Sequence, residues 1–337
     1  MSKIQWTERT WNPTRGCRRI SPGCVNCYAE KVATRFCGEG LPYEGLIQLG
    51  KWNGETTFAA DKLTDPLSWQ KPALIFVDSM SDLFYEGFSA AQIDQVLAVM
   101  LLTPRHTYQV LTKRADRMAK YLTDPGLYGR VLACADEIRL RHPRLRLNEI
   151  GISDPSKVPA SWIWWGVSVE NQEYADKRIP WLLDTPAAVR FVSYEPALGP
   201  VDFTRMQVVA PRPPNGPGVW LNALTGHVAG PDDVLPAKLD WLIAGGESGT
   251  GARPFDIAWA HSAVEQCKAA GVPVFVKQLG ARPIGLRDDV CDACSSGLVV
   301  PRNRHGLDCP GGPVLRDPKG GDWTEWPADL RVREFPR

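Results

Sequence analysis

Six short apolar runs recur along this 337-residue chain, and polar or charged residues follow each of them. The runs are rich in Val, Ile, Leu and aromatic residues, and they are too continuous for strands with one face in solvent. This pattern predicts buried parallel strands. The runs span residues 73–82, 107–114, 161–171, 189–196, 239–249 and 272–280.

Helical patterns lie between several of these runs. Ser89 and Gln92 have the spacing of a capping box ahead of an apolar face. Asp256 and Gly271 are the expected start and stop of a later helix. Residues 27–36 would form the first helix, with a strand before them. Six or seven strand–helix repeats favour an α/β fold, a partial or complete (β/α) barrel of about six to seven parallel strands, over a doubly wound sheet.

Three stretches interrupt this alternation of strands and helices, at residues 124–158, 205–236 and 281–321. We therefore expect a barrel core over residues 1–280 with insertions in the first two stretches. The third stretch would be a small Cys/His-rich metal-binding insertion, and residues 322–337 would return to the core.

The polar residues that follow the apolar runs are the first candidates for a site, because (β/α) barrels carry their chemistry where strands end and loops begin. Any one of them could be an ordinary polar loop residue or part of a salt bridge. Six strand ends with such residues indicate one lined pocket. The candidates are Ser79, Ser81, Asp82, Lys113, Arg114, Ser168, Glu170, Asn171, Glu195, Glu247, Lys277 and Gln278.

Charge and hydropathy indicate the cellular location of this protein and the surfaces that it can bind. The net charge of +1 provides no bulk field for nucleic acid or an anionic membrane, so such contacts need a local patch. No apolar run approaches the ~18 residues of a membrane span, and the N-terminus lacks the apolar core of a signal peptide. We expect a cytoplasmic protein without membrane contact. In that reducing setting, clustered cysteines favour metal or redox chemistry over disulfides.

Three of the nine cysteines, Cys17, Cys24 and Cys27, lie within eleven positions. Cys24 and Cys27 can face one ion or cluster, and a turn at Pro22 and Gly23 can bring Cys17 to the same place. Three readings stay open. The cysteines could be unrelated buried residues, or they could hold structural zinc, which needs a fourth ligand. They could also hold an iron–sulfur cluster with one iron open to another ligand.

Eight segments, in order, resemble the phage-associated three-cysteine-motif family of uncharacterised proteins (DUF5131-like), which is regarded as a divergent branch of the radical S-adenosylmethionine (SAM) superfamily. The resemblance covers most of the chain outside the three interruptions. The usual aromatic before the last cysteine is Asn26 here, and Tyr28 follows it instead. The segments are TWNPTRGCRRISPGCVNCYAE, VDSMSDLF, VLTKR, GVSVENQEYADKRIP, RFVSYEPALGPVD, AGGESGTGARP, VFVKQLG and DWTEWPADLRVREFP.

The resemblance implies a radical SAM enzyme. The three cysteines would bind three irons of a 4Fe–4S cluster, and the amino and carboxylate groups of SAM would chelate the fourth. Reductive cleavage of SAM would give a 5′-deoxyadenosyl radical that abstracts hydrogen from a substrate. A flavodoxin- or ferredoxin-like protein would donate the electron, and the substrate could be a nucleotide or a modified nucleic-acid base.

The resemblance also suggests roles for the strand-end residues. Tyr28, Ser79, Ser81 and Asp82, with Lys113, Ser168, Glu170 and Asn171, would bind the cofactor. Glu195, Glu247 and Lys277 would be the catalytic candidates. Lys113, Arg114 and Lys277 could meet a phosphate or carboxylate of the substrate.

A second metal site is predicted near the C-terminus. The spacings of Cys291, Cys294, His305 and Cys309 suit one tetrahedral zinc ion. The surrounding stretch has little apolar content, so a metal could supply its folding free energy. An auxiliary iron–sulfur cluster and unbound cysteines in a loop are the alternatives.

Two further readings of function stay open. Residues 139–146 form a basic run that could track phosphates or could be a solvated helix end. With both cysteine groups structural, the chain would be a non-catalytic zinc-dependent nucleic-acid-binding protein. In a barrel hydrolase or lyase, Glu195 and Glu247 would form an acid/base pair.

Overall fold

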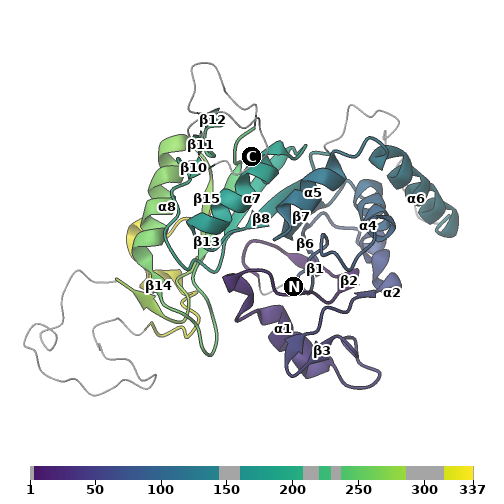
Figure 1. Cartoon of the computed structure of the whole chain (residues 1–337), viewed down its shortest axis with the longest axis horizontal. Helices are drawn as coiled ribbons and strands as arrows, with labels where there is room; N and C mark the ends of the chain where they lie inside the picture. The colour runs from purple at the N-terminus through teal and green to yellow at the C-terminus, as the bar shows by residue number, and fades with distance from the viewer. Residues whose placement is uncertain (1–3, 144–159, 208–219, 229–236, 286–314, 337) are drawn as a thin grey trace, which may run out of the picture.

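A computed structural model describes residues 4–143, 160–207, 220–228, 237–285 and 315–336. Its centre is a sheet of seven parallel strands, in which the order across the sheet is the order in which these seven strands occur in the chain. The sheet curls into a half-barrel (Figure 1). Its strands, in order, are β1 (Arg9–Trp11), β6 (Leu74–Val77), β7 (Thr107–Thr112), β8 (Ile163–Ser168), β9 (Val189–Tyr194), β13 (Trp241–Gly245) and β15 (Val274–Gln278). All six apolar runs form strands, so the predicted barrel-like α/β fold is confirmed.

The described residues form eight helices, and most of them cover the convex face of this sheet (Figure 1). They are α1 (Tyr28–Ala33), α2 (Ala60–Leu63), α3 (Asp65–Ser68), α4 (Ala90–Leu102), α5 (Ala115–Leu122), α6 (Leu127–Arg141), α7 (Gln172–Asp184) and α8 (Ile257–Ala270), with 3-10 turns at Pro22–Cys24, Thr34–Phe36, Trp323–Glu325 and Ala328–Leu330. Of these helices, α1 lies apart, at the lower edge of the half-barrel in Figure 1. None of the helices in the described part of the chain is long and apolar enough to cross a membrane.

The local signals that predicted two of these helices are present in the structure. At the start of α4, Ser89 Oγ accepts from the Gln92 backbone N–H, and the Gln92 side chain accepts from the Ser89 N–H. The Asp256 carboxylate accepts from the N–H of Ala258 at 2.9 Å, and Gly271 ends α8 with a φ of +66°. Both helix boundaries therefore follow from capping chemistry that is visible in the sequence.

In the described part of the chain, nine further short strands form small sheets around the main one. Two of these sheets lie within the N-terminal segment that contains the three cysteines. The strands are β2 (Thr14–Arg15) with β5 (Thr57–Phe58), β3 (Ile47–Gln48) with β4 (Lys51–Trp52), β10 (Met206–Gln207) with β11 (Trp220–Asn222) and β12 (His227–Val228), and β14 (Phe255–Asp256) with β16 (Pro283–Ile284).

The two faces of the main sheet have separate apolar cores, because successive side chains along a strand point to opposite faces. The larger core lies between the sheet and the helices. The smaller one is largely aromatic and fills the concave face, where it contains Phe191 and Trp241. The Phe191 ring lies flat against Gly166, where a Cβ would be 2.5 Å from the ring.

The C-terminal segment covers the free edge of the sheet at β15. The Val276 N–H donates to Val332 O at 2.9 Å, and the Glu334 N–H donates to Val274 O at 3.0 Å. Trp241 Nε1 also donates to Glu334 O at 2.8 Å. These bonds use the backbone groups of an edge strand that would otherwise be free to pair with another chain.

Candidate functional site

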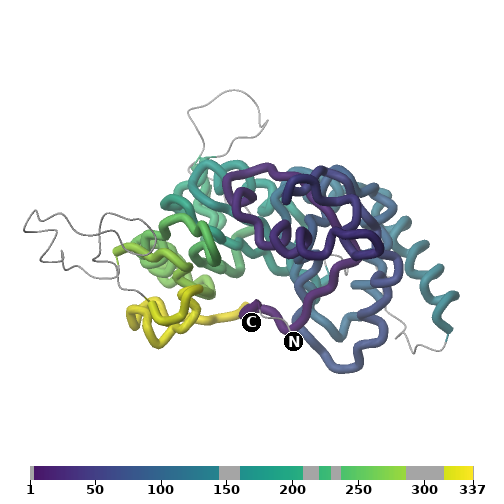
Figure 2. The backbone as a smooth tube through the Cα atoms, turned by 90° about the horizontal axis from the view of Figure 1, so that it is seen from below, coloured from purple at the N-terminus to yellow at the C-terminus, as the bar shows by residue number. Residues whose placement is uncertain are grey.

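The cysteine loop, residues 16–28, crosses the mouth of the half-barrel. All seven strands are parallel, so their C-terminal ends meet along one edge of the sheet. Figure 1 places α1 and β3 at the lower edge of the sheet, and Figure 2, seen from below, shows this N-terminal segment in purple between the early strands in blue and the later ones in green.

Groups that follow four strands hold this loop. Tyr28 donates to Ser79 O after β6 at 2.5 Å. Arg114, after β7, donates to Arg18 O at 2.9 Å. Ser21 donates to Glu170, after β8, at 2.6 Å. After β13 the contacts are Asn26 Nδ2 to Glu247 Oε2 and Arg253 Nη1 to Pro22 O, both at 2.9 Å.

Each thiol of the loop has a different polar neighbour. Arg114 Nη1 lies 3.8 Å from Cys17 Sγ, and Ser21 Oγ lies 3.7 Å from Cys24 Sγ. Burial raises the pKa of Cys27, and backbone N–H groups of Glu30 and Ala29 oppose that rise. Burial also raises the pKa of Cys17 to about 12, with a smaller contribution from Asp82. All three cysteines are free thiols.

The three thiols of this loop are of the ligand type that iron–sulfur clusters take. In the described part of the chain, no three His, Cys, Asp or Glu side chains are grouped so that they could hold one metal ion. Cys17 and Cys27 pack against an apolar group that includes Trp52 and Met80, which limits water at this side of the loop.

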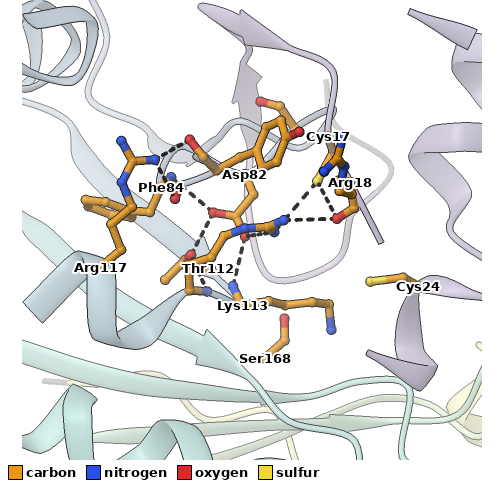
Figure 3. Close-up of polar contacts among 12 residues, drawn as sticks. Cys17, Arg18, Cys24, Asp82, Phe84, Thr112, Lys113, Arg117 and Ser168 are labelled. Atoms are coloured by element: carbon orange, nitrogen blue, oxygen red, sulfur yellow. Dashed lines mark hydrogen bonds and ion pairs between the residues drawn. The ribbon is translucent and has the colours of Figure 1, made fainter. Parts of the chain in front are cut away.

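Asp82 is the centre of a buried network beside Cys17 (Figure 3). Its carboxylate accepts from Thr112 Oγ1 at 2.6 Å, the Lys113 N–H at 2.9 Å and Arg114 Nη1 at 3.1 Å. The Phe84 N–H is a fourth donor at 3.1 Å. The sequence suggested Asp82 as a cofactor-binding residue. In this structure its carboxylate instead accepts hydrogen bonds from residues at the end of β7.

Glu170 is the buried anchor of the cysteine loop. Its side chain is fully buried, and it pairs with Lys113 and, at 3.0 Å, with Arg178 of α7. Ser21 is its third donor. Burial alone would raise the pKa of Glu170, but the two cations outweigh burial and the pKa is lowered. The carboxylate is therefore charged near neutral pH, and it holds the loop against β8.

Glu195 and Lys277 form an ion pair across β13. Lys277 Nζ lies 3.0 Å from Glu195 Oε1, although β13 separates their strands. The pair passes over Gly245, where a Cβ would be 2.8 Å from the same oxygen. Both side chains keep some exposure, 12% for Glu195 and 23% for Lys277, although the paired oxygen of Glu195 is itself buried.

Glu247 is held by Arg253 from the same loop. Arg253 Nη2 and Nε donate to its two oxygens at 2.7 Å and 3.1 Å. Burial raises the pKa of Glu247, but hydrogen bonds from Arg253 and Asn26 more than offset it, so the pKa is lowered. The structure does not pair Glu247 with Glu195, since each carboxylate has its own cation.

The remaining predicted residues each make local contacts of their own. Ser79 donates to Asn12 Oδ1 at 3.0 Å, and Ser81 is hydrogen-bonded to Thr14. Asn171 caps α7, and Ser168 is buried at the end of β8. The structure thus brings together Tyr28 with Ser79, Lys113 with Glu170, and Glu195 with Lys277, whereas Asn171 serves its own helix.

Sequence reasoning missed Asp78, which directly follows β6. It is 3% exposed and adopts a φ of +57°, which is uncommon outside glycine. One oxygen accepts from the Thr14 N–H at 3.1 Å, and the other has no hydrogen-bond partner. Burial raises its pKa to about 7. The sequence signal was an Asp directly after a buried strand, in the same segment as Ser79 and Asp82.

Some predictions fall on residues that the structure does not describe. The proposed zinc ligands Cys291, Cys294, His305 and Cys309 lie there, as do the last residues of the basic run. At the described end of that run, Arg139 and Arg141 pair with Asp136 and Glu137 on the surface of α6.

The comparison with protein families gives a match to this chain. The model of the family described as "Protein of unknown function (DUF5131)" matches residues 1–293. No curated protein and no solved structure matches the chain.

Proposed function

This chain belongs to the DUF5131 family of proteins of unknown function, and from that premise we propose that it is a radical SAM enzyme in which Cys17, Cys24 and Cys27 hold a 4Fe–4S cluster. One observation carries the proposal: a loop with three free thiols is fixed across the mouth of a parallel half-barrel by contacts to four strand ends. When bound, the reduced cluster supplies the electron that cleaves SAM, so that hydrogen can be taken from a substrate.

The number of thiols supports an open iron. Of the other cysteines in the described residues, Cys37 bonds to Thr34 O at 3.2 Å, Cys134 lies in α6 and Cys267 is buried in α8. None of them belongs to the loop. Three thiolates satisfy three irons and leave the fourth for the amino and carboxylate groups of SAM.

The residues around the loop would fix the cluster and limit water. Glu30 of α1 pairs with Arg19 of the loop and accepts from the Trp52 N–H at 2.7 Å. These bonds connect both ends of the three-cysteine segment to the small apolar core that packs on Cys17 and Cys27. A rigid, partly dry surrounding keeps the ligands in place.

The mouth offers groups for the rest of SAM and for a substrate. Tyr28 and Ser79 are joined at one side, and the partly exposed Glu195–Lys277 pair lies on later strands. In this proposal the first two orient SAM, and the ion pair contacts SAM or substrate. The substrate would be a nucleotide or a modified nucleic-acid base, and a flavodoxin- or ferredoxin-like protein would be the reductant.

The test is the metal content of protein purified without oxygen. Wild type should contain about four irons and matching sulfide per chain, and SAM should change the EPR spectrum of the dithionite-reduced protein. The Cys17→Ala/Cys24→Ala/Cys27→Ala variant should lose this iron. A Cys37→Ala/Cys134→Ala variant, which removes two thiols outside the loop, should keep it.

Zinc content separates the alternatives. Zinc without iron at the three N-terminal cysteines would refute the radical mechanism and favour the structural, nucleic-acid-binding alternative. A Cys291→Ala/Cys294→Ala/Cys309→Ala variant that loses zinc and keeps iron would show that the second cysteine group is a separate zinc site. Absence of nucleic-acid binding at low salt would remove the nucleic-acid substrate and leave the enzyme proposal standing.

A further inference from the structure

Arg114 is the cation that contacts a sulfur of the three-cysteine loop. Among the described residues, no other Arg or Lys side chain is hydrogen-bonded to Cys17, Cys24 or Cys27, and Arg114 Nη1 lies 3.8 Å from Cys17 Sγ. The other two thiols meet neutral groups, a hydroxyl at Cys24 and backbone N–H groups at Cys27. The three cysteines therefore differ in the charge of their surroundings, and in the described residues Cys17 is the one in contact with a cation.

The guanidinium is held in place on every side. It donates to Asp82 at 3.1 Å, to Glu86 at 3.2 Å and to Arg18 O at 2.9 Å. It also lies over the Tyr85 ring, 4.8 Å from its centroid. The side chain is only 4% exposed. Because a planar guanidinium with this many partners cannot rotate away, its charge stays beside Cys17.

This burial changes the role expected for Arg114. Its position after β7 suggested contact with a substrate phosphate or carboxylate. A substrate anion would have to displace Asp82, whose carboxylate has three other donors. Apart from Asp82, Glu86, the Arg18 carbonyl and the Tyr85 ring, the group that contacts the Arg114 guanidinium is the sulfur of Cys17.

We infer that Arg114 is a positioning residue that fixes the Cys17 corner of the cluster and raises its reduction potential. The inference rests on the proposed function, since it concerns the same cluster. Reduction adds one negative charge to the cluster, and a fixed cation at hydrogen-bonding distance stabilises the reduced form more than the oxidised form. Charge and hydrogen bonds at the sulfurs are known determinants of such potentials. Burial strengthens the effect, because the surrounding dielectric is low.

The experiment is an EPR-monitored redox titration of the anaerobically purified cluster protein. Arg114→Gln removes the charge, whereas Arg114→Lys keeps the charge and loses the planar fork. The matched control is Arg117→Gln in α5. Arg117 donates to the carbonyls of Phe84, Tyr85 and Phe88 and does not contact the cysteines, and Figure 3 shows it well away from Cys17.

We expect the midpoint potential of the Arg114→Gln protein to be lower than that of wild type. The potential of Arg114→Lys should lie between those two values. The potential of Arg117→Gln should equal that of wild type. Unchanged potentials in both Arg114 variants, at full iron content, would overturn the inference and leave the cluster proposal intact. An equal fall in Arg117→Gln would also overturn it. If Arg114→Gln fails to fold, the Arg114→Lys value decides. Wild type without iron would refute the proposed function and this inference together.

Discussion

Glu170 lies so close to Gly23 that a Cβ on the glycine would be 2.4 Å from its Oε1 atom. The two residues belong to the two parts of the site, the cysteine loop and the end of β8. Only a residue without a side chain lets the loop come close enough for Ser21 to donate to the same carboxylate. This contact sets the height of the loop above the sheet.

Gly23→Ala should therefore push the cysteine loop away from β8. The buried carboxylate cannot move easily, because Lys113 and Arg178 hold it. We expect a loss of iron content and a decrease in unfolding free energy of roughly 1–3 kcal/mol, as for other overpacked sites. Metal analysis and chemical denaturation measure the two effects. Gly129→Ala in α6, where a Cβ meets no atom within 4 Å, is the control. It should keep its iron and should not lose unfolding free energy, because alanine is a better helix former than glycine.

Glu170→Gln should destabilise the fold, because it leaves Arg178 and Lys113 without their counter-charge. Arg178 is 5% exposed and cannot reach water, so the cost should approach the ~3–5 kcal/mol of a broken buried ion pair. The pKa of Glu170 is lowered in the folded protein. Its stabilisation is thus present above the ordinary pKa of 4.5 and is lost as the pH falls below it. Denaturation curves at several pH values should show a larger acid-side loss in wild type than in Glu170→Gln, because Glu247 and other carboxylates with lowered pKa values remain in the variant.

The control for Glu170→Gln is Glu173→Gln in α7, the helix that follows Glu170. Glu173 pairs with Lys177 on the surface, so its loss should change the unfolding free energy by less than about 1 kcal/mol. Equal stability of the Glu170→Gln protein and wild type at pH 7 would contradict a structural role for the ion pairs of Glu170 with Lys113 and Arg178.

Asp78→Asn should stabilise the protein progressively as the pH rises from about 4 to 7. Burial raises the pKa of Asp78 from 3.8 to about 7, so the folded state holds the proton more tightly than the unfolded state. Wild type therefore has its full stability below pH 3.8 and loses it as the pH rises through 7. The difference between the two proteins should reach at most about 4 kcal/mol at high pH. Asparagine also tolerates the positive φ at this position.

The measurement is the unfolding free energy of both proteins between pH 4 and 8.5, with Asp116→Asn on the surface of α5 as the control. A pH-independent difference between Asp78→Asn and wild type would show that Asp78 does not retain its proton in the folded state.

Gly166→Ala should overpack the concave core. The new Cβ would lie 2.5 Å from the Phe191 ring, which is fully buried. We expect a loss of roughly 1–3 kcal/mol in unfolding free energy. Adding Phe191→Leu should recover part of this loss, because the smaller side chain gives the methyl group space. Denaturation of the four proteins of this double-mutant cycle measures the coupling, and strictly additive losses would refute the contact.

Much of the fold could be predicted because its signals are local. Ser89 with Gln92 and Asp256 with Gly271 determine helix ends within a few residues. The ends of the apolar runs similarly placed Lys113, Glu195 and Lys277 at the mouth. The pairs that these residues form could not be predicted, since each depends on strand order and on the curl of the sheet.

The sequence by itself determined the strands, the helices, their order and the three cysteines in one loop, because each of these depends on neighbours in the chain. Only the tertiary structure decided what the loop contacts. Ser21 meets Glu170 across 149 positions of sequence, and Asn26 meets Glu247 across 221. Such contacts arise when a parallel sheet brings all its strand ends to one edge, and no local pattern encodes which strand end will face which residue of the loop.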